Sequence, residues 1–150
     1  MLKSEMLGTF LDFDCFLVAG RYTLLDHSAL HELMPLCLEK DISLILGGPY
    51  NSGILASDLD TKSTYFYDPS PLEVIERAKK IKGVCDRHQI PLKAAALQFG
   101  LMHRSVAATI PGPRSPGEIK DNIAMASVKI DSDLWKELKQ EKLIHQDCPE

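Results

Sequence analysis

The sequence has little of what would indicate a membrane, secreted or nucleic-acid-binding protein. No apolar run approaches the roughly 20 residues that a membrane-spanning helix needs. The amino-terminal stretch lacks the basic-then-apolar order and the small-residue cleavage site of a signal peptide. The net charge is −4 at pH 7, whereas binding to nucleic acid favours a strong basic excess. We therefore expect a cytoplasmic protein that binds neither membranes nor nucleic acids.

Patterns for disulfides and metal ions are also missing. The four cysteines form no CxxC pair, and we expect no disulfide. Cys15, Cys37 and Cys85 lie in apolar or helical patterns that predict buried free thiols. The five histidines form no HxH or HExxH motif, and the stretch HELMP at 31–35 lacks the second histidine of a zinc-protease helix. The sequence thus predicts no metal site.

What the sequence does contain is an alternation of apolar runs and helical patterns. With 150 residues, 45% of them hydrophobic and 25% charged, the chain can form one domain (1–150) with a real core. Continuous apolar runs span 15–20, 42–48 and 105–112, as strands buried on both faces require. Because helical patterns separate the runs, the sequence predicts an α/β fold with parallel strands and right-handed crossovers.

Six helices are expected around these strands. They cover 3–12, a segment from about Ser28, a segment from Pro71, 91–103, a segment from Pro116, and 132–144. Ser70 and Ser115 each precede a proline and stand three residues before a glutamate, so both are predicted N-caps. Asp131 is predicted to cap the last helix. Pro35 is expected to kink the helix that begins near residue 28.

The stretch TIPGPRSPGEIKDN (109–122) takes the third strand directly into a helix start. A helix start has unpaired N–H groups and a partial positive charge, which favour anions. Gly112 lets a ligand approach the backbone closely, and Arg114 adds a planar cation suited to phosphate. One turn further, the Asn122 amide offers the donor and acceptor that match the edge of adenine. The pattern predicts the adenosine half of a dinucleotide site; the alternative is a plain capped helix with a surface arginine.

Two other strand ends are candidates for binding. In GGPYNSG (47–53), glycines directly after a strand would let backbone amides approach a pyrophosphate, although the stretch is neither a Walker A loop nor GxGxxG. The alternative is a tight turn before the long polar loop that follows. Tyr22 stands at the end of the first strand and could stack on a flat ring, while the alternative, a core tyrosine, is favoured by the sequence alone.

These strand ends, in this order, resemble those of the aldo-keto reductase family. AGRYTLLD and YNSGIL are similar to its aldose 1-dehydrogenase branch, and IPGPRSP followed by Asn122 is similar to the family in general. The resemblance runs from about residue 5 to 144. It implies that the chain is the C-terminal portion of a (β/α)8 TIM barrel that uses NAD or NADP. Residues 15–20, 42–48 and 105–112 would then be strands six, seven and eight of an incomplete barrel.

The resemblance also implies which residues hold the cofactor. The pyrophosphate would lie on the loop after the second strand, and the adenosine end on the loop and helix after the third. The implied residues are Gly48, Pro49, Tyr50, Asn51, Ser52 and Gly53 for the pyrophosphate, and Ile110, Pro111, Gly112, Arg114, Glu118, Asp121 and Asn122 for the adenosine end. Tyr22 is added as the residue that would stack on the cofactor.

Several positions depart from the family pattern. Ala19 takes the position of a glutamine near the nicotinamide amide, and Gly47 that of an aromatic residue that stacks on nicotinamide. Gly112 and Glu118 take the positions of a lysine and an arginine that surround the 2′-phosphate in NADP-dependent members. A carboxylate there would accept from a ribose 2′-OH and repel a phosphate, so we expect a preference for NAD, with Arg114 as the main objection.

The family's catalytic residues are absent from this chain. The resemblance places the catalytic Asp, Tyr, Lys and His on strands two to four, and no residue here matches those motifs, so no catalytic residue is predicted. A complete barrel takes about 250 residues. The shorter chain therefore favours a truncated or split product, whose exposed strand edges need a partner.

Four interpretations of function follow. The first is the cofactor-binding part of an NAD(P)-dependent enzyme that, when complete, oxidises the C1 hydroxyl of an aldose or reduces a carbonyl. The second is a non-catalytic nucleotide-binding or interaction module that pairs with a complementary chain. The third is a fragment with no activity of its own. The fourth, a small doubly wound α/β domain, is disfavoured by the order of the motifs.

Overall fold

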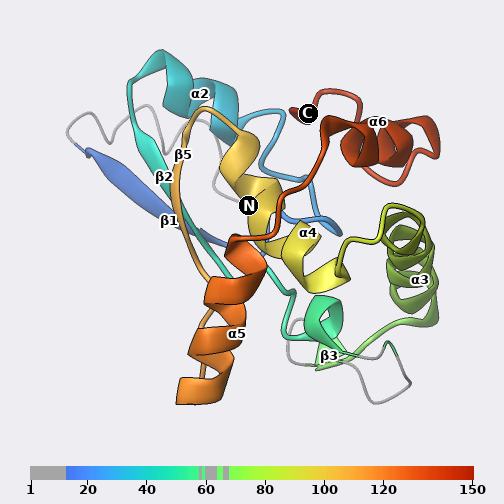
Figure 1. Cartoon of the computed structure of the whole chain (residues 1–150). Helices are drawn as coiled ribbons and strands as arrows, with labels where there is room; N and C mark the ends of the chain where they lie inside the picture. The colour runs from blue at the N-terminus through green and yellow to red at the C-terminus, as the bar shows by residue number, and fades with distance from the viewer. Residues whose placement is uncertain (1–12, 58, 60–63, 66–67) are drawn as a thin grey trace.

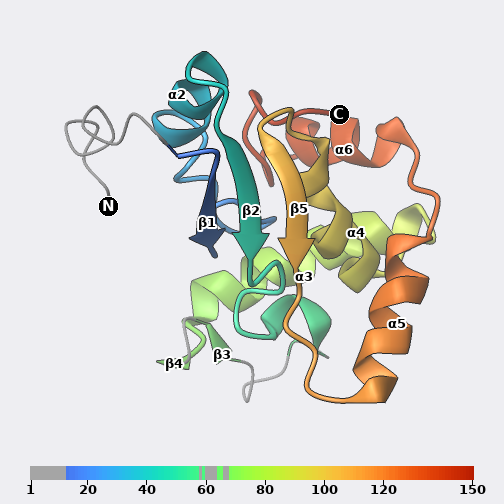
Figure 2. The same cartoon turned by 90° about the vertical axis from the view of Figure 1, so that its left-hand side faces the viewer.

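The computed structural model describes residues 13–57, 59, 64–65 and 68–150. The expected helix over 3–12 lies outside these residues, as does part of the long polar loop. Within them, three parallel strands form a sheet in the order β1-β2-β5, so that β2 is central (Figure 2). They are β1 (Cys15–Ala19), β2 (Ser43–Gly47) and β5 (Val106–Ile110). The three expected parallel strands are confirmed, each one to three residues shorter than expected.

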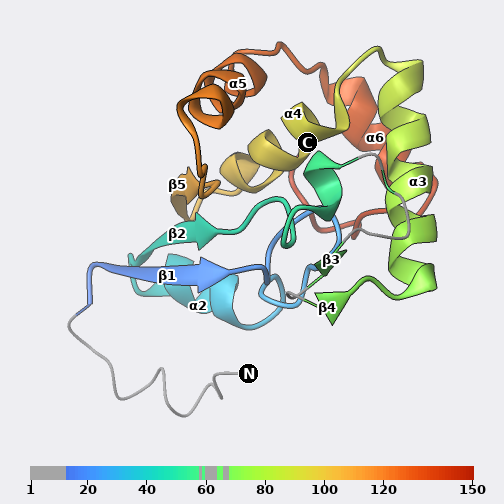
Figure 3. The same cartoon turned by 90° about the horizontal axis from the view of Figure 1, so that it is seen from below.

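The helices lie beside the sheet in layers. Figures 1 and 3 show α4 next to the strands and α3 and α6 beyond it, and α5 contacts α4. The helices are α2 (Leu33–Glu39), α3 (Leu72–Arg87), α4 (Leu92–Phe99), α5 (Pro116–Ala126) and α6 (Ser132–Gln140). Two short 3-10 turns, η1 (Ile54–Ala56) and η2 (Gly100–Met102), and a small antiparallel pair, β3 (Thr64–Tyr65) and β4 (Asp68–Pro69), complete the described elements. The helices of the fold thus cover one side of the sheet.

The core lies between the sheet and α4. Leu44 and Leu46 of β2 are buried and face this core, together with Phe99 of α4. On β1, alternate residues are exposed, and Leu17 is 62% exposed. The expectation of strands buried on both faces is therefore wrong for all three strands, because only Leu44 and Leu46 of β2 are buried and no described element covers the second face of the sheet. Cys15 is exposed for the same reason, whereas the other three cysteines are buried free thiols.

Helix α2 begins later than expected. Residues before it form turns, in which the Asp26 carboxylate accepts a hydrogen bond from the Ser28 N–H (2.8 Å). The helix starts only at Leu33, so Pro35 falls in its first turn. A proline there removes no intrahelical hydrogen bond, because the first N–H groups of a helix have no such partner. The expected kink therefore has no cause.

Two of the three predicted caps are confirmed. Ser115 Oγ accepts from the N–H of Glu118 (3.2 Å), and Asp131 Oδ1 accepts from the N–H of Asp133 (3.2 Å). The cap predicted at Ser70 is wrong: α3 begins one residue later, after Pro71, and its start has no side-chain cap. None of the described helices is long and apolar enough to cross a membrane.

Candidate functional site

A glycine in left-handed conformation follows each of the three parallel strands. The φ angles are 65° at Gly20, 64° at Gly48 and 67° at Gly112, a region that L side chains rarely adopt. No atom lies within 4 Å of where a Cβ would stand at Gly48 or Gly112. The backbone at the ends of β2 and β5 is therefore open to close approach by a ligand.

The loops that follow β2 and β5 are hydrogen-bonded to each other. The N–H of Gly48 donates to the Ile110 carbonyl (3.2 Å), and the Tyr50 hydroxyl donates to Asn122 Oδ1 (2.8 Å). Because the strands are parallel neighbours, their carboxyl ends lie at one edge of the sheet, where Figure 2 shows both loops. The structure thus brings residues 48–53 and 110–122 together.

The loop over 48–53 is a tight turn with three consecutive left-handed residues. The φ angles are 47° at Asn51, 58° at Ser52 and 103° at Gly53. The Asn51 N–H donates to Gly48 (3.1 Å) and the Gly53 N–H to Tyr50 (3.0 Å), so these two amides already have partners within the loop. A ligand would therefore contact the exposed glycines and Ser52 rather than a row of free amides.

Asn51 carries a buried acceptor without a partner. Its side chain is 4% exposed, and its Oδ1 makes no hydrogen bond to any of the described residues. A buried polar atom left in this way costs about 1–3 kcal/mol. An oxygen acceptor cannot bind a phosphate oxygen, but it fits a hydroxyl or an amide donor.

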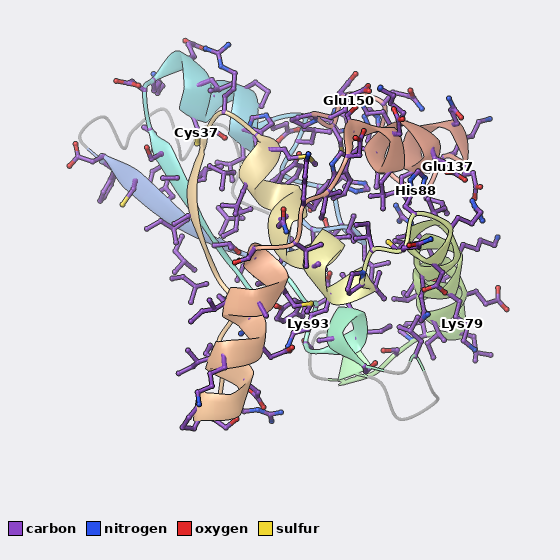
Figure 4. All side chains as sticks on the ribbon, viewed as in Figure 1. Cys37, Lys79, His88, Lys93, Glu137 and Glu150 are labelled. Atoms are coloured by element: carbon purple, nitrogen blue, oxygen red, sulfur yellow. The ribbon has the colours of Figure 1, made fainter. Side chains whose placement is uncertain are left out.

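Tyr50 and Asn122 lie in a buried cluster rather than on the open surface. Tyr50 is 8% exposed and Asn122 is 7% exposed. Lys93, at the start of α4, stands over the Tyr50 ring at 5.2 Å and pairs with Asp121; Figure 4 labels this lysine. Burial, and then the negative charge of Asp121, raises the pKa of Tyr50, so its hydroxyl remains a donor. One Asn122 oxygen lone pair is thus used by Tyr50, while its NH₂ group has no hydrogen bond to the described residues.

The start of α5 holds the segment that carries Arg114. Glu118 Oε2 accepts from the backbone N–H of Arg114 (2.7 Å), while its own N–H is capped by Ser115. The Arg114 side chain is exposed, and none of the ion pairs among the described residues includes it. The guanidinium is therefore available to an anion beside the exposed Gly112.

Tyr22 lies apart from the other predicted residues. It is 2% exposed, and its ring packs on Phe99 (5.0 Å between centroids) and on His103 (5.7 Å). This position favours the alternative of a core tyrosine. Lys93 is the residue that sequence reasoning missed, because its helix is apolar on nearly every side and gave no sign that its lysine reaches the loop after β2.

A parallel α/β sheet with open glycines and a capped helix start at its carboxyl edge is typical of proteins that bind nucleotides. Comparison with protein families gives the particular class. The aldo/keto reductase family profile matches residues 9–142, and the chain belongs to this family, whose members are NAD(P)-dependent oxidoreductases.

Characterised relatives cover most of this chain. The chain is 38% identical to pyridoxal 4-dehydrogenase of Microbacterium luteolum over 133 aligned residues. The alignment covers 89% of this chain and 39% of the relative. The chain is 37% identical over 134 residues to D-threo-aldose 1-dehydrogenase of a Pseudomonas species, with 89% and 41% covered. NADH-specific methylglyoxal reductase of Escherichia coli is 21% identical over 136 residues, with 83% and 42% covered. The chain thus spans about two fifths of the length of these relatives.

Solved structures support the same fold. An aldo-keto reductase from Bacillus halodurans superposes in its apo form with a TM-score of 0.72 at 20% identity, covering all of this chain and 52% of that one. Its holo form gives a TM-score of 0.67 at 20% identity, covering 51% of that chain. The three-stranded unit therefore corresponds to about half of an aldo-keto reductase barrel.

Proposed function

We propose that this chain is the C-terminal, cofactor-binding part of an NAD(P)-dependent aldo-keto reductase. Strands β1, β2 and β5 would be strands six, seven and eight of the barrel. The observation that carries the proposal is the junction of the two glycine-opened loops through the Gly48–Ile110 hydrogen bond, with the exposed Arg114 further along the second loop. In barrels of this kind, phosphates bind at the loops after the last two strands and a nearby helix start.

Each part of the dinucleotide has a fitting group at this edge. The pyrophosphate would lie against Gly48, Ser52 and Gly53, where the glycines allow close approach although their N–H groups are bonded within the fold, and Arg114 beside Gly112 would supply the charge. The unpaired Asn51 oxygen fits a ribose hydroxyl or the carboxamide of nicotinamide, both of which can donate. When bound, the cofactor supplies the hydride acceptor or donor of the reaction, and the residues of this chain bind and orient it.

The adenosine end would lie along α5. Ile110 and Pro111 lead into this segment, and the Asn122 NH₂ group could donate to adenine, with Asp121 beside it. Glu118 has one carboxylate oxygen engaged by the Arg114 N–H and a second that could accept from a ribose 2′-OH. A 2′-phosphate would meet that negative charge, which supports a preference for NAD over NADP.

Catalysis would depend on residues outside this chain. With the rest of a barrel present, the enzyme would oxidise an alcohol such as the C1 hydroxyl of an aldose, or reduce a carbonyl. The named activity of the Pseudomonas relative, on an aldose, supports a sugar, and that of the Microbacterium relative, on pyridoxal, supports a ring-borne alcohol or aldehyde. A complementary chain could supply that part.

The second candidate is a nucleotide-binding or interaction fragment without activity of its own. The open face of β1 favours it, because an apolar side chain such as Leu17 would be covered if the chain paired with another. The two candidates differ in one result: mixing with a chain that holds the missing strands would restore oxidoreductase activity only under the first.

The binding site itself can be tested on the isolated chain. We expect calorimetric titration to give tighter binding of NAD than of NADP, and Arg114→Ala to weaken NAD binding at least about tenfold, since a charge-assisted hydrogen bond contributes about 1.5–3 kcal/mol. Arg104→Ala is the matched control, because Arg104 is exposed and stands before the opposite end of β5. Equal affinities in the two variants, or no binding of either nucleotide, would contradict the proposal.

A further inference from the structure

The C-terminal segment is held against the body of the fold by several anchors. Cys148 is 2% exposed, and its N–H donates to the carbonyl of His145 (3.1 Å). Gln146 Nε2 donates to the Lys139 carbonyl (2.8 Å), and Lys139 also pairs with Glu150 (2.8 Å), which Figure 4 labels near α6. The backbone of residues 145–148 is therefore fixed before any ligand binds.

Three side chains with metal-binding atoms meet on this segment. His145 and Asp147 come from the segment, and His31 comes from the loop before α2. The two imidazole rings pack edge to face at 4.5 Å between centroids. One ligand atom from each of the three residues lies within 4.8 Å of the others. Two imidazole nitrogens and a carboxylate oxygen form a ligand set that Zn²⁺ takes in proteins.

The geometry of the His145–Asp147 pair fits chelation. His145 Nδ1 accepts a hydrogen bond from the Asp147 N–H (3.2 Å), so its one lone pair points toward Asp147, and an ion bound there would take the place of that hydrogen bond. It lies 3.6 Å from Asp147 Oδ2. Around a tetrahedral zinc ion with bonds of about 2.0–2.2 Å, two ligand atoms stand roughly 3.4 Å apart. The pair therefore needs only a small movement to share one ion.

His31 would complete the site from a second part of the chain. Its neighbours Ala29 and Leu30 are 5% and 6% exposed, so the loop is anchored while the His31 ring stays at the surface. A small side-chain rotation would bring its nitrogen from within 4.8 Å to ligand distance. The third ligand is thus preorganised by the fold and independent of the HxD pair.

We infer that His31, His145 and Asp147 bind one divalent transition-metal ion, with Zn²⁺ as the best fit, and that a water takes the fourth position. Two imidazoles and a carboxylate suit Zn²⁺ better than Mg²⁺ or Ca²⁺, which favour oxygen ligands. The ion joins the C-terminal segment to the loop before α2. This revises the expectation of no metal site, which considered only motifs contiguous in sequence. The C-terminus lies at the opposite end of the sheet from the strand exits (Figure 2), so this inference does not depend on the proposed function.

The experiment is a calorimetric titration of the full chain, without an affinity tag, with Zn²⁺ and with Mg²⁺. We expect one Zn²⁺ per chain, no Mg²⁺ binding, and a higher melting temperature in Zn²⁺. Co²⁺ in place of Zn²⁺ should give the visible absorption of a four-coordinate ion. His31→Ala, His145→Ala and Asp147→Asn should each weaken binding at least about tenfold, since even partners outside the ligand set contribute 10–100-fold.

His88→Ala is the matched control. His88 is a partly exposed histidine between α3 and α6, and its Nε2 lies 2.5 Å from Glu137 Oε2. Figure 4 labels both residues. Removal of this histidine should leave zinc affinity unchanged. The three ligand side chains are exposed, so in the absence of metal each variant should melt at the same temperature as the unchanged chain. This measurement checks that the variants fold. The inference is overturned if the chain binds no Zn²⁺, or if His145→Ala binds it as tightly as the control does.

Discussion

The two faces of the three-stranded sheet have similar side chains but different surroundings. On the face toward α4, Leu44 is fully buried and Leu46 is 3% exposed. On the other face, Leu17 is 62% exposed and Ala108 is exposed. The apolar runs therefore form two apolar faces, while the described residues pack on only one of them. The difference shows that an apolar strand face indicates that something packs on it, and that this can be another chain.

The largest expected effect compares one leucine from each face. Leu44→Ala should lower the free energy of unfolding by about 2–5 kcal/mol, because it leaves a cavity in a closed core. Leu17→Ala removes the same atoms from an exposed position and should change it by less than about 0.5 kcal/mol. Urea denaturation of both variants measures the difference. A large loss in Leu17→Ala would mean that the second face is covered in solution.

Two glycines sharpen the comparison on the helix side. A Cβ at Gly100 would stand 2.3 Å from Leu46 Cδ1, so Gly100→Ala should overpack the covered face and cost about 1–3 kcal/mol. At Gly83, inside α3, no atom lies within 4 Å of the added Cβ. Gly83→Ala should stabilise by about 0.5–1 kcal/mol through helix propensity. Thermal or urea unfolding checks both, and the close packing between η2 and β2 would be in doubt if the two changes had the same sign.

Much of the fold could be predicted because its signals are local. Three apolar runs and the residues around Ser115 and Asp131 specify strands and helix starts through spacing and capping chemistry. The errors come from tertiary context. Ser70 has the same local pattern as Ser115, yet α3 begins one residue later without a side-chain cap. Burial of β1 depends on whether anything packs on its second face, which its own residues cannot encode.

The candidate site was predictable only as far as strand order allows. Parallel neighbouring strands bring their ends together, so the proximity of the loops after β2 and β5 follows from the pattern. The Tyr50–Asn122 bond, the position of Lys93 over Tyr50 and the meeting of His31 with His145 are contacts between distant segments. These contacts depend on the directions that the side chains take after the helices and loops have packed. The spacing of residues along the sequence does not predict those directions.

The covered side of the sheet also contains a histidine that should make stability depend on pH. His27 packs near Phe99 (5.7 Å between centroids), and burial, with Arg77 nearby, lowers its pKa from 6.5 to about 4. Between these values the unfolded chain binds more protons, so stability should fall by about 3 kcal/mol as the pH drops from 7 to 4. Urea denaturation at several pH values measures the slope. His27→Gln should flatten it, and an unchanged slope would assign the effect to other groups.

The smallest loss of a contact is expected at the edge of the sheet, where the loop after β2 meets α5. Tyr50→Phe removes the hydroxyl that donates to Asn122 and leaves a buried acceptor, which should cost about 1 kcal/mol. The ring and its contact with Lys93 remain, so the loss reports the hydrogen bond. A double-mutant cycle with Asn122→Ala isolates the coupling. Coupling near zero would show that packing under Tyr50, and not this bond, joins the two loops. Coupling of about 1 kcal/mol would show that the bond itself holds the loop after β2 to the helix that carries Glu118.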